Sequence, residues 1–298
     1  MRVLYDLVIV GGGAAGLTAA LYASRSGLDC IVLDPSSPEG SSIALTDAVE
    51  NYTGFSDIAG FDLIQHFYSH AKSFGANFVR QSLVGIRKNY DGFILECSDS
   101  EVKTKSVILC MGATHKKLGI DGENKFEGRG VSYCAVCDGA FFRDEDLLVV
   151  GGGDSAVEEA VFLTQFAKTV TIAHRRDQLR AQKVLQDRAF ANDKIHFAWN
   201  TVVEEIKGEQ KVTSVLLKDV KTGEVREQAF GGVFIYVGLD PVSDFATELG
   251  ILDENGWVVT DDHMRTTVPG IFAVGDVRQK DLRQVTTAVG DGAIAGQE

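Results

Sequence analysis

The fold is decided by residues 7–25, which read LVIVGGGAAGLTAALYASR. The stretch from Leu4 to Val10 predicts a short buried strand, and the residues after Gly16 favour a helix, so the glycines fall on the turn between them. Their spacing is G-x-G-x-x-G, which lets backbone N–H groups and a helix N-terminus approach a pyrophosphate. The stretch therefore predicts a dinucleotide site formed by Gly11, Gly13, Ala14, Ala15 and Gly16.

The strand that follows the predicted helix, CIVLD, ends at Asp34. In a fold of this kind an acid at this point accepts hydrogen bonds from a ribose. The same acid would repel a phosphate on that ribose, so the first site is expected to take a nucleotide with an unmodified ribose. FAD fits this description.

A second copy of the pattern begins at Gly151. The strand LLVV runs into GGGDSA, followed by a predicted helix and the strand TVTIA. This strand ends in a basic cluster instead of an acid, and arginine pairs well with a ribose 2′-phosphate, so the second copy favours NADPH over NADH. The residues expected at this site are Gly151, Gly153, Asp154, Ser155, Ala156, His174, Arg175, Arg176 and Arg180.

Each copy taken alone has another interpretation. Glycine-rich turns follow strands in many α/β proteins that bind nothing there, and HRRDQLR (174–180) could be a solvated helix start. Two complete copies with opposite charge at the corresponding position argue against coincidence.

Composition excludes several classes of function. The formal net charge of -13 argues against nucleic acid, whose affinity comes mainly from lysine and arginine. The apolar run LVIV is too short for a membrane span or a signal-peptide core, so a soluble, cytoplasmic protein is expected. Five cysteines are too sparse for a disulfide-stapled secreted scaffold.

Further strands complete the predicted α/β fold. The segments 106–114 and 271–276 read as buried strands, the second with an acid at its end. We therefore expect two Rossmann-like, three-layer dinucleotide-binding domains, with the NADPH domain (114–240) inserted into an FAD domain built from 1–113 and 241–298. The expected hinges are 112–114 and 238–240.

The stretch SYCAVCDG (132–139) places two cysteines at C-x-x-C spacing. Zinc bound by Cys134 and Cys137 would need two more ligands at matching spacing, and the sequence offers none, so no metal site is expected. A reversible disulfide fits better, because C-x-x-C lowers a thiol pKa toward neutrality. Asp138 is in position to handle the proton, although Asp-Gly is also a common turn. The remaining cysteines, expected as small core residues, are Cys30, Cys97 and Cys110.

Over nearly its whole length the chain resembles the low-molecular-weight thioredoxin reductases. The motifs that carry the resemblance are, in order, GGGAAGLTAALYASR, ENYTG, VILCMGAT, VSYCAVCDGAFFR, GGGDSAVEEA, HRRDQLRAQ, GIFAVGDV and RQVTTAVGDGAIA. The position of C-x-x-C-D-G at the front of the inserted domain separates this group from glutathione-reductase-like relatives. The resemblance implies FAD contacts, beyond the first loop, from Asn51, Gly112, Gly275, Asp276, Arg283 and Gln284.

The resemblance also implies a mechanism. Electrons would pass from NADPH to FAD, then to the Cys134–Cys137 disulfide, and then to a thioredoxin or a similar dithiol protein. Cys137 would face the flavin, Cys134 would attack the partner, and Asp138 would act as acid and base. Because nicotinamide and disulfide would compete for one side of the flavin, a hinge rotation between two arrangements is expected. The resemblance further implies a homodimer.

Two departures from the family pattern lie in the first domain. The family's Gly-Gly-Gln reads Gly40-Ser41-Ser42 here, which removes a glutamine amide expected near the flavin ring, and the family's N-x-P-G reads Asn51-Tyr-Thr-Gly54. Three other functions remain open on this scaffold: a dithiol oxidase, a ferredoxin-linked disulfide reductase, and a flavin-binding sensor that turns over slowly. The HRR cluster counts against the oxidase, which has no need of NADPH.

Overall fold

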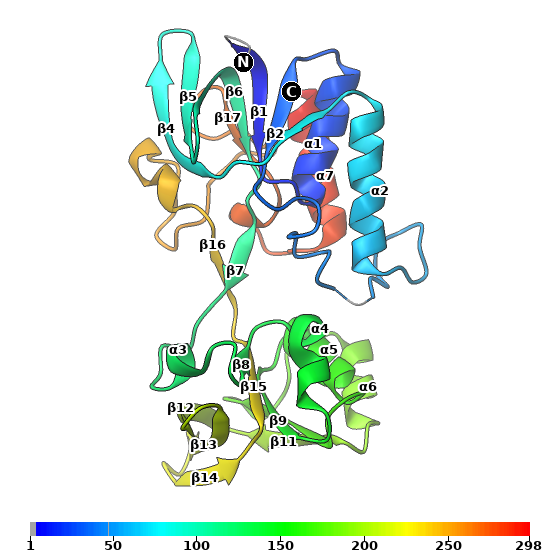
Figure 1. The fold of residues 1–298 in the computed structure, drawn as a ribbon, viewed down its shortest axis with the longest axis vertical. Coiled ribbons are helices and arrows are strands. Elements are labelled where there is room, and N and C mark those ends of the chain that lie inside the picture. The colour runs from blue at the N-terminus through cyan, green and yellow to red at the C-terminus, as the bar shows by residue number, and fades with distance from the viewer. Residues whose placement is uncertain (1–3, 47) are drawn as a thin grey trace. The chain divides into compact units, whose positions relative to one another are not determined.

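The computed structural model describes residues 4–46 and 48–298, and the chain divides into two compact units. The first unit comprises the residues up to Thr114 together with Asp240–Glu298, and the second unit is His115–Leu239 (Figure 1). These limits lie one residue from the predicted domain limits, while the nucleotide assigned to each unit stays a prediction. Among the described residues, no helix has the length and apolar character needed to cross a membrane.

The first unit is built on a parallel sheet in the order β3-β2-β1-β6, with β17 also paired to β6. Helices cover one face of this sheet (Figure 1), and an antiparallel hairpin extends it through the first half of β6. The strands are β1 (Tyr5–Val10), β2 (Cys30–Leu33), β3 (Asn77–Val79), β4 (Leu83–Asn89), β5 (Gly92–Cys97), β6 (Glu101–Leu109) and β17 (Ile271–Ala273). The helices are α1 (Ala14–Arg25), α2 (Gly60–Ser73) and α7 (Val285–Gln297), with the 3-10 turns η2 (Asp244–Leu249) and η3 (Gly275–Val277).

Alternate residues of β1 enter two different cores. Leu7 and Ile9 pack into the cluster that contains the α1 alanines, whereas Val8 and Val10 pack into the cluster that contains Phe93 of the hairpin. This period of two is the reason that β1 reads as a continuous apolar run, because a strand covered on both faces has no polar side. Burying each such side chain contributes roughly 1.5–3 kcal/mol.

The second unit repeats this plan with the sheet order β11-β10-β9-β15-β8. Its strands are β8 (Val131–Ser132), β9 (Asp146–Gly151), β10 (Thr169–His174), β11 (Ile195–Trp199) and β15 (Gly232–Tyr236), and a separate antiparallel sheet is formed by β12 (Thr201–Gly208), β13 (Val212–Asp219) and β14 (Val225–Ala229). Its helices are α3 (Glu123–Phe126), α4 (Ala135–Asp138), α5 (Asp154–Leu163) and α6 (Lys183–Phe190), with the 3-10 turn η1 (Gly139–Phe142).

Residues of β9 alternate in the same way as those of β1. Leu147 and Val149 pack with α5, and Leu148 and Val150 pack with the β12–β14 sheet. Both units therefore have three layers around a parallel sheet, and the predicted fold class is confirmed.

The structure differs from the predicted elements at the segment 106–114. That segment is not one strand: β6 ends at Leu109, and a short strand, β7 (Ala113–His115), follows separately. The chain leaves the first sheet at Gly112, whose φ of +71° is in the left-handed region that interrupts a strand. β7 pairs with β16 (Leu239–Pro241), so the two segments predicted as hinges form a two-stranded sheet with each other.

Candidate nucleotide sites and redox disulfide

A cavity of about 520 Å³ opens in the first unit where the strands of its parallel sheet end. Ligands of open α/β sheets bind at this edge, because the loops after the carboxyl ends of the strands gather there. The predicted FAD residues that line it are Gly11, Gly13, Ala14, Ala15, Asp34, Gly112, Gly275, Asp276, Arg283 and Gln284. The structure therefore brings together residues from both ends of the chain.

The three fingerprint glycines of this loop have different local roles. A Cβ on Gly16 would lie 1.9 Å from the carbonyl oxygen of Gly11, and a Cβ on Gly11 would lie 2.4 Å from that of Cys110. These two glycines permit close packing of the backbone. A Cβ on Gly13 would meet no atom within 4 Å, so this glycine leaves open space at the N-terminus of α1.

Asp34 closes the loop after β1. Its Oδ2 accepts a hydrogen bond from the backbone N–H of Gly12 at 2.6 Å, and its Oδ1 accepts those of Ser36 at 2.8 Å and Ser37 at 2.7 Å. The carboxylate is thus fixed by backbone donors at the cavity wall. Oδ2 retains acceptor capacity, and the role of Asp34 toward a ribose stays a prediction.

Two further parts of the cavity carry polar groups from the end of the chain. Asp276 is half-buried; its Oδ1 is itself buried, lies 3.7 Å from Lys280 Nζ and has no hydrogen-bond partner among the described residues. Burial raises the pKa of Asp276, while the charges of Lys280 and Arg283 lower it. The Arg283 guanidinium lies 3.7 Å from the centroid of the Trp257 ring. No motif in the sequence marked Trp257 as part of this site.

The predicted contacts Asn51 and Gln284 touch each other directly. Asn51 Nδ2 donates to Gln284 Oε1 at 2.9 Å, which joins the ENYTG motif to the start of α7. At the other departure from the family pattern, where Gly40-Ser41-Ser42 stands for Gly-Gly-Gln, Ser41 and Ser42 line the cavity. Ser41 Oγ accepts a hydrogen bond from Ala44 N at 3.3 Å, and the Ser42 carbonyl accepts one from Thr46 Oγ1 at 3.1 Å. The cavity lining thus has Ser42 at the position where the family pattern has glutamine.

The loop of the second unit follows the same plan. A Cβ on Gly153 would meet nothing within 4 Å, whereas a Cβ on Gly152 would lie 2.4 Å from His174 Nδ1. His174 is 5 % exposed, and its Nε2 has no hydrogen-bond partner in the part of the chain that the structure describes. Burial lowers the pKa of His174, as do the nearby charges of Arg180, Arg176 and Arg175.

The basic cluster of the second unit lies at the protein surface. Arg175, Arg176 and Arg180 are exposed, and no carboxylate in the described part of the chain forms an ion pair with them. Asp154, also predicted at this site, holds Gln182 through both carboxylate oxygens, at 2.7 Å from its backbone N and at 2.7 Å from its Nε2.

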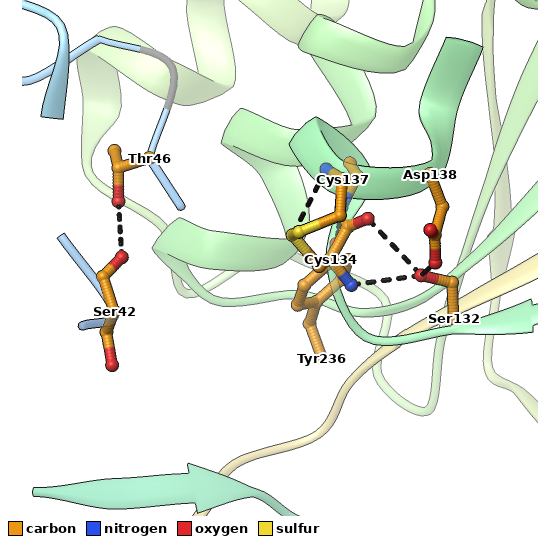
Figure 2. Close-up of a disulfide and its surroundings, with 8 residues drawn as sticks. Ser42, Thr46, Ser132, Cys134, Cys137, Asp138 and Tyr236 are labelled. Carbon is orange, nitrogen blue, oxygen red and sulfur yellow. Dashed lines mark hydrogen bonds between the residues drawn. A yellow bond between two sulfur atoms is a disulfide. The ribbon is translucent and has the colours of Figure 1, made fainter. Parts of the chain in front are cut away.

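Cys134 and Cys137 form a disulfide across the short helix α4, with Cα atoms 5.3 Å apart (Figure 2). The N–H of Cys137 donates to Cys134 Sγ at 3.2 Å. Two residues that no sequence motif singled out stabilise this turn. The Tyr236 hydroxyl accepts the N–H of Ala135 at 3.0 Å, and Ser132 Oγ accepts the N–H of Cys134 at 3.0 Å.

Asp138 lies at the end of α4 and is held by Ser132. Ser132 Oγ donates to Asp138 Oδ2 at 2.7 Å (Figure 2). Of the remaining cysteines, Cys30 and Cys110 are buried as expected, and Cys97 is half-buried at the end of β5. Burial raises the pKa of Cys110 strongly, because the thiol lies deep beside the backbone of the first loop.

Comparison with known proteins identifies the class of this chain. A family model described as "Pyridine nucleotide-disulphide oxidoreductase" matches residues 5–292. Thioredoxin reductase from Listeria innocua is 51% identical over 99% of this chain and 92% of its own, and that from Bacillus subtilis is 50% identical over 99% and 93%. A crystal structure of Lactococcus lactis thioredoxin reductase (FR conformation), 55% identical, superposes with a TM-score of 0.96 over 98% of this chain and 97% of that one.

The chain belongs to the pyridine nucleotide-disulphide oxidoreductases and, within them, to the low-molecular-weight thioredoxin reductases. It is a flavoprotein oxidoreductase of a group that binds FAD and uses NADPH, and Cys134–Cys137 is its redox disulfide. The predicted family, enzyme class and cofactors are confirmed.

Proposed function

We propose that this enzyme passes electrons from NADPH, by way of FAD, through the Cys134–Cys137 disulfide to a protein disulfide such as that of thioredoxin. The observation that carries the proposal is the formed disulfide on α4, in the unit whose glycine-rich loop is followed by a basic cluster. The cavity for a second nucleotide lies in the other unit.

The residues of the first unit fit FAD. The cavity volume of about 520 Å³ falls in the usual range of cofactor sites. Gly13 leaves space for a pyrophosphate at the start of α1, and the unpartnered Oδ1 of Asp276 is an acceptor suited to a hydroxyl of the cofactor. When bound, FAD supplies a carrier that accepts a hydride from NADPH and delivers two electrons to a disulfide.

The residues of the second unit fit NADPH. Gly153 leaves space at the N-terminus of α5 for a pyrophosphate, as Gly13 does at α1. Arg175 and Arg176 offer exposed guanidinium groups to a 2′-phosphate, and the buried, unpartnered Nε2 of His174 is a further group that a phosphate could engage.

The reduced enzyme reduces its partner by thiol–disulfide exchange. The Cys134 thiolate attacks the partner disulfide, a mixed disulfide forms, and the partner's first sulfur leaves as a thiolate. The Cys137 thiolate then attacks Cys134 Sγ, which re-forms the Cys134–Cys137 bond and releases the second partner sulfur. The two protons lost by the enzyme thiols reach the two partner sulfurs, and Asp138 serves as the base that accepts a proton and the acid that returns it.

The partner, assembly and location belong to the same proposal. Thioredoxin, or a similar dithiol protein, is the partner that the named relatives support. We propose that the enzyme works as a homodimer in the cytoplasm, where thiols are kept reduced, and that 112–114 and 238–240 act as hinges.

The test is anaerobic mixing with NADPH, followed by NADPH oxidation with a thioredoxin disulfide. We expect bleaching of the flavin and sustained turnover, with both lost when ferredoxin replaces NADPH. A flavin that stays oxidised with NADPH but bleaches with reduced ferredoxin would support the ferredoxin-linked function instead. Turnover driven only by a small dithiol and oxygen would support the dithiol oxidase.

A further inference from the structure

We propose that Ser132 is a positioning residue for Asp138, whose hydroxyl keeps the Asp138 carboxyl hydrogen-bonded in both of its protonation states. This inference rests on the proposed acid–base role of Asp138 and extends it. Ser132 ends β8, one residue before the redox turn begins at Tyr133-Cys134.

The Ser132 hydroxyl stands between the redox turn and the carboxylate. Its Oγ lies 3.0 Å from Cys134 N, 3.2 Å from Cys134 O and 2.7 Å from Asp138 Oδ2 (Figure 2). The N–H of Cys134 can only donate, so it occupies one of the two lone pairs of Oγ. The single hydroxyl proton is then free to go to one of two oxygens.

The two oxygens suit the two states of Asp138. When the carboxylate is ionised, the Ser132 proton is donated to Oδ2, as the short 2.7 Å distance indicates. When Asp138 is protonated on Oδ2, that proton is donated to the second lone pair of Oγ, and the Ser132 proton turns to Cys134 O at 3.2 Å. Every donor in the set keeps an acceptor in both states.

Burial makes this arrangement matter. Ser132 is 4 % exposed, so water cannot readily replace its hydroxyl, and a buried polar group left without a partner is costly. An alanine at this position would leave both Cys134 N and Asp138 Oδ2 without their present partner. The Asp138 carboxyl would then lose its fixed position relative to the cysteine turn.

The neighbouring titratable groups do not duplicate this function. The Tyr236 hydroxyl, on β15, accepts a hydrogen bond from Ala135 N. Burial, the charge of Glu159 in α5 and, to a smaller extent, the charge of Asp138 raise the pKa of Tyr236, while the hydrogen bond from Ala135 N lowers it. Tyr236 therefore stays neutral over the working pH range. Ser132 is the hydroxyl that reaches the Asp138 carboxylate within hydrogen-bond distance in the described residues.

The experiment measures exchange by the full enzyme after chemical reduction of its disulfide. The holoenzyme is reduced with dithiothreitol, freed of reductant, and mixed anaerobically without NADPH with a chromogenic aromatic disulfide between pH 5 and 9. We expect Ser132→Ala to lower the exchange rate at pH 7 by about tenfold, because the Asp138 carboxyl loses the hydroxyl that holds it beside the cysteine turn.

A double variant decides whether Ser132 acts through Asp138. We expect Asp138→Asn to lower the rate by about 100-fold. Adding Ser132→Ala to Asp138→Asn should then cause no further loss. If the two losses multiply, Ser132 does not act through the carboxylate and the inference is wrong.

A control elsewhere in the unit separates catalysis from folding. Thr169 Oγ1 donates to the Asp146 carboxylate at 2.6 Å, away from the redox turn, so Thr169→Val removes a comparable bond. It should lower the thermal midpoint but leave the rate profile in place. If Ser132→Ala does not fold, the isosteric pair Ser132→Thr and Ser132→Val isolates the hydroxyl, and the Thr variant should exchange about tenfold faster than the Val variant.

The failures are distinguishable. A wild-type rate and profile in Ser132→Ala, with a slow Asp138→Asn, would overturn the role of Ser132 and leave Asp138 as acid and base. A wild-type rate in Asp138→Asn would overturn the proposed function of Asp138, and with it the inference about Ser132.

Discussion

The glycine-rich loops after β1 and β9 have the same backbone arrangement, but an acidic side chain contacts the first loop and a basic side chain contacts the second. In the first, the Asp34 carboxylate at the end of β2 accepts the N–H of the middle glycine, Gly12, at 2.6 Å. In the second, the His174 ring at the end of β10 packs on the middle glycine, Gly152, where a Cβ would lie 2.4 Å from Nδ1. The same position along the fold therefore carries an acid in one unit and a base in the other.

This difference separates what the fold requires from what the ligand requires. The last glycine of each Gly-Gly-Gly run, Gly13 or Gly153, is called the outer glycine here. It faces open space at a helix N-terminus, and we expect both nucleotides to need this space for their pyrophosphate. The residue at the end of the second strand is free to differ, because we expect it to meet the part of the nucleotide that differs. We therefore propose that one scaffold selects two cofactors through a single pair of positions.

The largest expected effect is at Gly16, the last glycine of the G-x-G-x-x-G pattern in the first loop. Gly16→Ala places a Cβ 1.9 Å from the Gly11 carbonyl oxygen, which the backbone can relieve only by separating α1 from β1. We expect a loss of roughly 3–5 kcal/mol in stability and loss of bound flavin. Thermal unfolding and flavin absorbance measure both.

The second loop supplies the matched control. Its corresponding residue is already Ala156, so Ala156→Gly removes a Cβ and should cost only about 1 kcal/mol through backbone entropy. Equal effects of the two substitutions would show that the loops are not packed as described.

Reversing the basic cluster should reverse the choice of nucleotide. Replacing Arg175 and Arg176 with Glu removes charge-assisted contacts to a 2′-phosphate and adds repulsion. We expect the ratio of kcat/KM for NADPH to that for NADH to fall by about 100-fold or more, with the stability little changed because both side chains are exposed. An unchanged ratio would remove the basis for assigning NADPH to this unit.

The outer glycines should separate binding from stability. A Cβ at Gly13 or Gly153 meets no protein atom within 4 Å, so alanine at either position should change stability by less than about 1 kcal/mol. Each substitution should weaken one nucleotide by roughly tenfold: Gly13→Ala the flavin, by equilibrium dialysis, and Gly153→Ala NADPH, by its KM. If Gly13→Ala weakened NADPH instead, the two assignments would be reversed.

The smallest effect is a dependence of stability on pH. His174 has a pKa lowered from 6.5 by burial and by three arginines, so its stabilising contribution is complete above pH 6.5 and falls as the pH drops, because the unfolded chain gains the proton first. The slope is at most about 1.4 kcal/mol per pH unit for one proton. His174→Gln should flatten this part of the stability profile, whereas His196→Gln, at an exposed site on β11, should leave it.

The parts of the molecule that could be predicted from the sequence are those fixed by neighbours along the chain. The strand–turn–helix around Gly11 and the acid at Asp34 follow from local spacing, and the structure brings them to one cavity. The C-x-x-C pair likewise needs only one helical turn to form its disulfide.

The parts that could not be predicted depend on contacts between distant segments. Trp257 lies against Arg283, and Tyr236 reaches Ala135 across the second unit. Asp291 of α7 joins Gly275, which follows β17, through a 3.0 Å hydrogen bond. No local pattern marks these residues, since an aromatic or an acid in an amphipathic segment has the same appearance whether or not it supports a site.

The most direct test of the account is thioredoxin reduction by Cys134→Ser compared with the wild type. With NADPH and a thioredoxin disulfide under anaerobic conditions, we expect the wild-type enzyme to turn over and the variant to lose at least about 1,000-fold of the rate, with its flavin still bound. The variant lacks the Cys134 thiolate that forms the mixed disulfide with the partner. A Cys134→Ser enzyme that still reduced thioredoxin at the wild-type rate would contradict the electron path from the second unit's disulfide to the partner.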